Sequence, residues 1–253
     1  MTWLPIIAID FLNLFGLQEW TISKEWQLPF LWWEIYREAR YTEMLQWLML
    51  ATAAGIALMT YVQRKGIKSQ PDQLAWLIFS TTLLLMLIED SLNLRHLVAD
   101  VHLPYLLGIE QLARSQRTLW ELCFYALLAT GMTIPLWLLW RDGFRLKSVT
   151  ASHVFLAYAI YGSVGFGSAL RKAGDWQSGL GAWLIEALNL SQMPAWRLAL
   201  EKMAYWQDTF PGYNHTLGYL LVDHLLEETI EFIAATLLLT AILQLRATTK
   251  VAR

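Results

Sequence analysis

The sequence predicts an all-α fold: a polytopic transmembrane helix bundle of about five spans, with its N-terminus outside and its C-terminus in the cytoplasm. Of the 253 residues, 56% are hydrophobic and only 16% are charged, and the mean hydropathy is +0.37. In soluble domains roughly a quarter of the residues are charged. Five stretches of about 20 mostly apolar residues are each long enough to cross a bilayer as a helix.

The predicted spans are bounded by residues that commonly end membrane helices. Arg64, Lys65 and Gly66 follow the first span, and Arg141 and Gly143 follow the third. A backbone in lipid must satisfy its own hydrogen bonds, so these stretches are expected to be helices and not strands. The predicted spans are residues 42–62, 73–95, 118–140, 150–170 and 216–245.

Basic residues set the expected orientation of the bundle. Lysine and arginine are concentrated in the short segments 63–72 and 141–149 and in the tail 246–253. By the positive-inside rule these parts face the cytoplasm. The longer segments 96–117 and 171–215 then lie on the outer face.

The regions outside the spans are expected at the membrane surface. Residues 1–17 are apolar but interrupted by Asp10, which favours an interfacial helix or re-entrant piece, with a sixth span as the alternative. The tryptophan-bearing segment 176–206 predicts one or two amphipathic helices. The chain is expected to form a single transmembrane domain, with an outer or interfacial segment 1–41, four spans in 42–170, an outer amphipathic segment 171–215, and the last span and basic tail 216–253.

Composition and motifs exclude several function classes. The formal net charge of −2 gives no basic surface for a nucleic acid. Cys123 is the only cysteine, so neither an intrachain disulfide nor a cysteine-based zinc cluster can form. The sequence contains no phosphate-binding loop, serine nucleophile elbow or dinucleotide fingerprint.

The last span carries the most informative polar cluster. Asp223, His224, Glu227, Glu228 and Glu231 lie within an otherwise apolar run. At about 100° per residue they fall on one helix face, within an arc of about 140°. A carboxylate at membrane depth costs roughly 2.5–3.5 kcal/mol on insertion scales, so four of them cannot face lipid. Compensating cations, or protonation of some carboxylates, are required.

The second span offers a matching polar face. Glu89, Asn93 and His96 are spaced to stack along one side of a helix, with Asp90 adjacent. Counted at 1.5 Å per residue from the cytoplasmic helix ends, the glutamates at the outer ends of four spans lie at depths of about 24–28 Å. These four are Glu43, Glu89, Glu121 and Glu227. We therefore expect one acidic layer near the outer face.

The residue types in this layer predict a metal centre. Carboxylates and imidazoles are the ligands of divalent or di-metal centres of iron, manganese or zinc in helical bundles. The expected ligands are Glu43, Glu89, His96, His224, Glu227 and Glu231, with Asp90 and Glu228 as catalytic proton carriers. The alternative is a plug of ion pairs near the headgroups, with Arg95, Arg40 and Arg171 as counter-ions.

Three short motifs resemble those of a loose group of uncharacterised bacterial polytopic membrane proteins. Glu38 and Glu43 precede the first span, Glu89 and Asp90 lie at the outer end of the second, and the pair Glu227–Glu228 lies in the last. The resemblance implies a shared polar site. Together with the compact positive-inside loops it implies an integral protein of a bacterial inner (plasma) membrane.

The favoured hypothesis is a membrane-embedded, metal-dependent enzyme that acts on a lipid-like or quinone-like substrate from the bilayer. Iron would suit an oxidoreductase, whereas zinc or manganese would suit a hydrolase. A proton- or cation-coupled transporter or channel is the second hypothesis, although the apolar run after Glu231 favours a one-sided site. A non-catalytic subunit or oligomer, contacting membrane-complex partners through its tryptophan-rich surface, is the third.

Overall fold

The computed structural model describes residues 28, 30, 32–33, 41–66, 69–141, 148–171, 174–210 and 215–251. Every regular element among these residues is a helix, and five helices are long and apolar enough to cross a membrane. The predicted all-α polytopic bundle is confirmed, and the protein is an integral membrane protein. Residues 1–17, for which an interfacial helix or a sixth span was predicted, lie outside the described residues.

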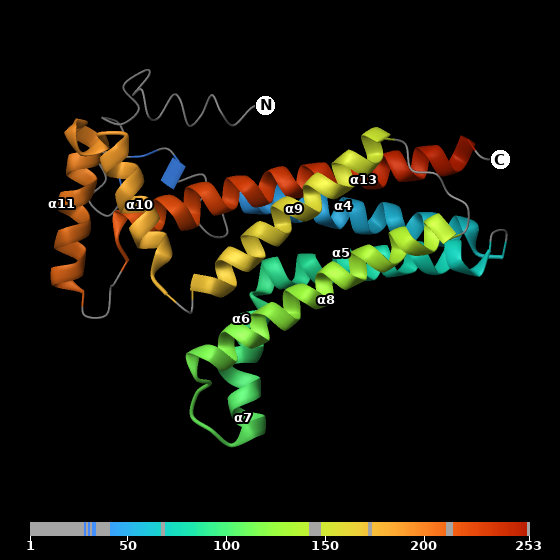
Figure 1. The fold of residues 1–253 in the computed structure, drawn as a ribbon, viewed down its shortest axis with the longest axis horizontal. Coiled ribbons are helices and arrows are strands. Elements are labelled where there is room, and N and C mark those ends of the chain that lie inside the picture. Colours follow the sequence, from blue (N-terminus) through green and yellow to red (C-terminus); the bar gives the residue numbers. More distant parts are fainter. Residues whose placement is uncertain are drawn as a thin grey trace. The chain divides into compact units, whose positions relative to one another are not determined.

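The long helices follow the predicted spans closely (Figure 1). They are α4 (Tyr41–Arg64), α5 (Gln70–Leu92), α8 (Arg114–Arg141), α9 (Ser148–Arg171) and a final run made of α12 (Leu217–Leu220), the π-helix η4 (Leu221–Glu227) and α13 (Glu228–Val251). Shorter helices connect them: α6 (Leu94–Leu97), the π-helix η2 (Val98–His102), α7 (Leu103–Leu107), α10 (Trp176–Ala187), the 3-10 helix η3 (Leu190–Gln192) and α11 (Pro194–Thr209). The segment 176–206 is thus helical, as predicted, and its position at a membrane surface stays a prediction.

The chain divides into two compact units. Unit 1 contains residues 1–43 and 175–229, and unit 2 contains residues 44–174 and 230–253. Unit 2 therefore contains most of the membrane-crossing helices. Unit 1 contains α10, α11, α12 and η4.

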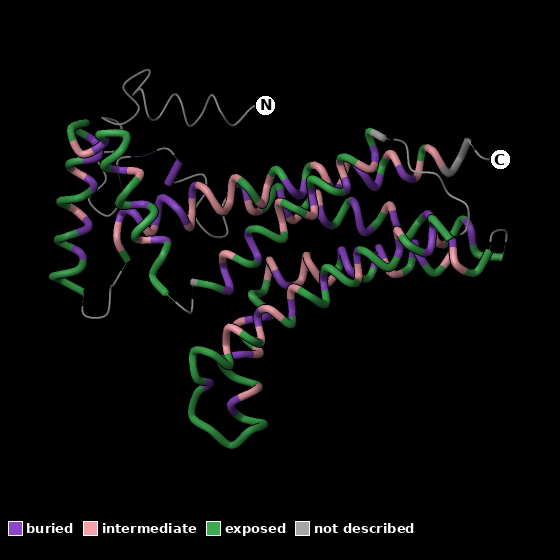
Figure 2. Tube along the Cα trace, in the orientation of Figure 1, coloured by how far each residue is buried: buried purple, intermediate pink, exposed green. Residues whose placement is uncertain are grey.

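Unit 2 is held together by small residues at helix contacts and by apolar side chains between them. A Cβ atom at Gly131 of α8 would lie 2.4 Å from the Thr82 hydroxyl of α5, so glycine permits this close approach. Ala53 and Ala57 of α4 are fully buried and belong to one apolar cluster with Trp76 of α5. Figure 2 shows buried and exposed faces alternating along these helices. The exposed faces carry large apolar side chains such as Phe155, as expected for contact with lipid.

Unit 1 is built on a backbone contact and an aromatic core. A Cβ atom at Gly181 of α10 would lie only 1.9 Å from the carbonyl oxygen of Gly218 in α12, so the two helices touch through their backbones. Buried apolar side chains surround this contact, and Phe30 packs on Trp196 with ring centroids 4.6 Å apart. The tight crossing fixes the position of η4, which follows α12 directly.

Candidate functional site

The two units divide the predicted site residues. Glu43, His224, Glu227 and Glu228 belong to unit 1, whereas Glu89, Asp90, His96 and Glu231 belong to unit 2. Among the described residues, no group of three or more His, Cys, Asp or Glu side chains is placed to hold a metal ion. A metal centre at these residues therefore stays a prediction, and the polar groups of each unit are considered separately.

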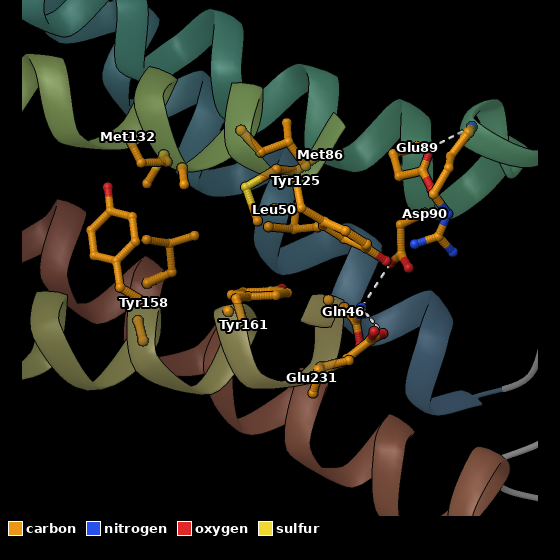
Figure 3. Close-up of a pocket in the computed structure, with 18 of the residues that line it drawn as sticks. Gln46, Leu50, Met86, Glu89, Asp90, Tyr125, Met132, Tyr158, Tyr161 and Glu231 are labelled. Carbon is orange, nitrogen blue, oxygen red and sulfur yellow. Dashed lines mark hydrogen bonds and ion pairs between the residues drawn. The ribbon is translucent and has the colours of Figure 1, made fainter. Parts of the chain in front are cut away.

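In unit 2, one buried amide joins two carboxylates from different helices. The Gln46 side chain of α4 is 1% exposed, and its Nε2 group donates to Asp90 Oδ2 of α5 at 2.8 Å and to Glu231 Oε2 of α13 at 3.2 Å. Figure 3 shows Gln46 between the two acidic side chains. The amide has only two N–H donors, so both are used in this bridge.

The end of α5 positions a second set of polar groups. Asn93 has the left-handed backbone conformation (φ 48°) that ends the helix, and asparagine tolerates this conformation better than most residues. The Arg95 backbone N–H then donates to Glu89 Oε2 at 2.7 Å, and Arg95 Nε lies 3.3 Å from Glu89 Oε1. The predicted row Glu89–Asn93–His96 is therefore interrupted, because the chain leaves the α5 axis before His96.

Arg95 links Glu89 to the next acidic group. Its Nη2 lies 3.3 Å from His96 Nε2, and His96 Nδ1 lies 3.8 Å from the carboxylate of Glu121 on α8. Arg95 was predicted as a counter-ion, and its ion pair with Glu89 confirms this role. Of the other predicted counter-ions, Arg40 and the side chain of Arg171 lie outside the described part of the chain.

Some of these polar groups form one end of a cavity of about 150 Å³ inside unit 2. Gln46, Glu89, Asp90, Asn93, Arg95 and Glu231 line its polar end. The remainder is lined by apolar side chains and by the rings of three tyrosines, with Leu50, Met86, Tyr125, Met132, Tyr158 and Tyr161 among the lining residues (Figure 3). The cavity therefore has a charged, hydrogen-bonding end and an apolar, aromatic body.

Tyr125 lies at the boundary between the polar end and the aromatic body of the cavity. The Arg95 guanidinium carbon lies 4.9 Å from the centre of the Tyr125 ring, a cation–π contact. The ring packs against Gly165 of α9, where a Cβ atom would lie 2.7 Å from the ring. Glycine at this position thus gives Tyr125 the space that it needs beside Arg95.

Buried polar atoms without a hydrogen-bond partner among the described residues occur in three residues of this lining. They include the donor Arg95 Nη1, the acceptor Gln46 Oε1 and the Tyr158 hydroxyl. Buried polar atoms are nearly always satisfied, and leaving one unsatisfied costs about 1–3 kcal/mol. Two residues of the polar end and one of the aromatic body thus carry a buried polar atom without a hydrogen-bond partner among the described residues.

Unit 1 contains a similar bridge, and its three residues are not among those that line the pocket described between α10 and α12. The Gln177 side chain of α10 is fully buried, and its Nε2 lies 3.0 Å from Glu227 Oε2 and 3.5 Å from Asp223 Oδ1. Both carboxylates come from η4, whose π-helical turn is wider than the α-helical turn assumed from the sequence. The neighbouring His224 ring packs edge-on against Trp33, with centroids 5.3 Å apart.

The sequence-based selection of site residues missed the neutral polar groups. Gln46, Gln177 and Tyr158 carry no charge. A single amide or phenol in an apolar helix is common, so its presence does not by itself indicate a binding site. The available signal was the placement of Gln46 three residues after Glu43 and of Tyr158 three residues before Tyr161. Each spacing places two polar groups on one helix face.

No protein-family model, curated protein or solved structure matches the chain.

Proposed function

We propose that this integral membrane protein binds a small amphiphile in the cavity of unit 2, with the polar head of the ligand at Arg95 and Gln46. The observation that carries this proposal is the pair of buried atoms Arg95 Nη1 and Gln46 Oε1. One is a donor and the other an acceptor, both belong to residues that line the same cavity, and neither has a partner among the described residues.

The chemistry of the cavity favours a ligand with two different ends. Binding sites for small molecules are mostly apolar and use a few polar groups to set orientation. Here Leu50, Met86 and Met132 provide apolar contact, while Arg95 and Gln46 provide directional hydrogen bonds. A lipid-like molecule would satisfy both parts of the wall at once.

The size of the cavity limits the part of the ligand that it can enclose. An engineered protein cavity of about 150 Å³ holds one benzene molecule. The cavity of unit 2, at about 150 Å³, matches the head of an amphiphile together with the first carbons of its chain. The rest of a long chain must therefore lie outside it.

The proposal is tested with ligands that share one chain and differ in the head. Protein in lipid nanodiscs is titrated with 1-decanol and with decane, and binding is measured by calorimetry. We expect 1-decanol to bind more tightly by about tenfold, because its hydroxyl both donates and accepts. Equal binding of the two ligands would contradict the proposal.

Variants identify the cavity as the place of binding. Gln46→Leu removes the free acceptor and is expected to lower the affinity for 1-decanol to that for decane. Gln63→Leu is the matched control, because Gln63 is an exposed residue near the other end of α4. If the affinity survives Gln46→Leu, the ligand binds elsewhere.

The predicted metal-dependent chemistry has a separate test. Elemental analysis by mass spectrometry of the purified protein, with Glu227→Gln and His96→Ala beside the wild type, measures iron, manganese and zinc per chain. Metal that is lost in both variants would place a catalytic centre in the protein and make the amphiphile a candidate substrate. A folded, metal-free protein would leave binding as its activity.

A further inference from the structure

We infer that the ligand is a membrane-soluble hydroquinone: a neutral aromatic ring with hydroxyl groups at opposite ends and an alkyl chain. This inference rests on the proposed amphiphile-binding function and specifies the head of the ligand. Three properties of the cavity carry it: the mixed charge of its lining, the placement of unpartnered polar groups toward opposite ends, and its aromatic wall.

The charges of the lining disfavour a charged head. An anionic head would lie beside the carboxylates of Glu89, Asp90 and Glu231, which line the same end of the cavity. A cationic head would lie beside Arg95 and would bring no acceptor for its Nη1 atom. Burying a charge next to a like charge is costly at low dielectric, so a neutral head is favoured.

The free polar atoms lie at both ends of the cavity. Arg95 Nη1 and Gln46 Oε1 are at the polar end, whereas the Tyr158 side chain lies at the far end, near Met132 (Figure 3). An aliphatic alcohol has one hydroxyl and reaches only one of these ends. A hydroquinone carries hydroxyls on opposite sides of its ring, so it can direct one hydroxyl toward each end.

The wall between the two ends suits a flat ring. Tyr125, Tyr158 and Tyr161 contribute aromatic rings to the lining, and aromatic pairs gain about 0.5–1.5 kcal/mol beyond burial alone. A cavity of about 150 Å³ is also close in size to one that holds benzene. The aromatic body thus matches a single six-membered ring.

The reduced form of the ligand is favoured over the oxidised form. Gln46 Oε1 is an acceptor and therefore needs a donor from the ligand. A hydroquinone hydroxyl supplies that donor and can still accept from Arg95 Nη1. A quinone oxygen can only accept, so it would leave Gln46 Oε1 without a bond.

The lining also indicates where the chain leaves the cavity. Ala129 of α8 and Gly162 of α9 both line the cavity and are both exposed at the surface of unit 2. A Cβ atom at Gly162 would meet no atom within 4 Å, so the space beside it is open. Both residues lie within membrane-crossing helices, so the opening faces the region that lipid occupies.

The test compares three probes that share a decyl chain. Decylhydroquinone, decylbenzoquinone and decylbenzene are titrated into the protein in nanodiscs under anaerobic conditions, which keep the first probe reduced. We expect decylhydroquinone to bind about tenfold more tightly than either other probe. Tyr158→Phe is expected to weaken the binding of decylhydroquinone several-fold. It should leave the affinity for 1-decanol unchanged, since the single hydroxyl of decanol is bound at the polar end.

Each other outcome contradicts a specific part of the argument. If decylbenzoquinone binds as tightly as decylhydroquinone, the inferred preference for the reduced form is wrong. If decylbenzene binds as tightly as decylhydroquinone, the hydroquinone inference fails. The amphiphile proposal still stands if Gln46→Leu lowers the affinity for 1-decanol. If neither decylhydroquinone nor 1-decanol binds, both fail. Tyr61→Phe is the matched control, because Tyr61 of α4 does not line the cavity. It removes a phenol hydroxyl and should leave the affinity for decylhydroquinone unchanged.

Discussion

Each unit of the protein contains a buried glutamine whose amide nitrogen donates to two carboxylates, and the two bridges differ in what surrounds them. Gln177 in unit 1 bonds Asp223 and Glu227, which lie on the same helical turn. Gln46 in unit 2 bonds Asp90 and Glu231, which come from two different helices. The first bridge joins one helix to its neighbour, and the second joins three helices beside a cavity.

The same polar motif can therefore stabilise helix packing in one unit and contribute to a binding cavity in the other. In unit 1 the bridge lies one helical turn from the Gly181–Gly218 contact and next to an aromatic core, so its geometry is fixed from several sides. Gln177 Oε1 and Gln46 Oε1 both lack a hydrogen-bond partner among the described residues, but only Gln46 lines the cavity of unit 2, together with Arg95 and Tyr158. We therefore expect changes at the bridge of unit 1 to alter stability alone, and changes at the bridge of unit 2 to alter ligand affinity as well.

The greatest loss of stability is expected when the backbone contact of unit 1 is disturbed. Gly181→Ala should lower the free energy of unfolding by about 3 kcal/mol or more, because its Cβ atom would overlap the backbone of Gly218, which cannot simply rotate away. Denaturation in SDS measures the change. Gly179→Ala is the matched control, because a Cβ atom there meets no atom within 4 Å. Equal effects of the two substitutions would show that the close contact is not needed.

The second prediction separates the two glutamine bridges. Gln177→Leu should lower the free energy of unfolding by about 2 kcal/mol, because it leaves two carboxylates of η4 without their amide donor. It should leave the affinity for 1-decanol unchanged, unlike Gln46→Leu. Gln192→Leu, at an exposed position of the same unit, should change neither quantity. Loss of decanol binding in Gln177→Leu would contradict the division of roles.

The third prediction concerns the guanidinium of unit 2. Arg95→Lys keeps the positive charge beside Glu89 but removes the planar group that faces both Tyr125 and the cavity. We expect the affinity for 1-decanol to fall about tenfold, with a smaller change in stability. Calorimetric titration measures the affinity, and Arg114→Lys, at the exposed start of α8, is the control. Unchanged affinity would show that charge alone suffices at this position.

The sequence was sufficient to predict the five membrane helices because hydropathy is a local property. The observed helix bounds differ from the predicted ones by a few residues, at positions where a particular residue begins or ends the helix. Pro71 lies in the first turn of α5, which begins at Gln70 and not at residue 73. Asn93 ends the same helix before residue 95 by adopting a left-handed conformation.

The arrangement of the polar site could be predicted only in part. Helical periodicity places Asp223 and Glu227 on one face, but it cannot say that Gln177, far away in sequence, supplies the donor between them. Periodicity also grouped Glu227 with Glu231, although they belong to different units. Partners across helices depend on packing, which is decided by small residues such as Gly165 and Gly181.

The smallest equilibrium effect is expected at the proposed opening of the cavity between α8 and α9. Gly162→Phe places a large side chain where the structure has open space, so it should narrow the path without disturbing the fold. A narrower path slows entry and exit together, so the association and dissociation rates should both fall while the dissociation constant changes little. Stopped-flow binding of decylhydroquinone measures both rates.

Ser163→Phe provides the comparison for this variant, because Ser163 is equally exposed on the next position of α9 and does not line the cavity. It adds the same bulk to the lipid-facing surface and should leave both rates unchanged. If Gly162→Phe also leaves them unchanged, the ligand enters past exposed Asn93 at the polar end. The comparison thus decides whether the ligand reaches the Gln46 bridge from the bilayer or from the aqueous side.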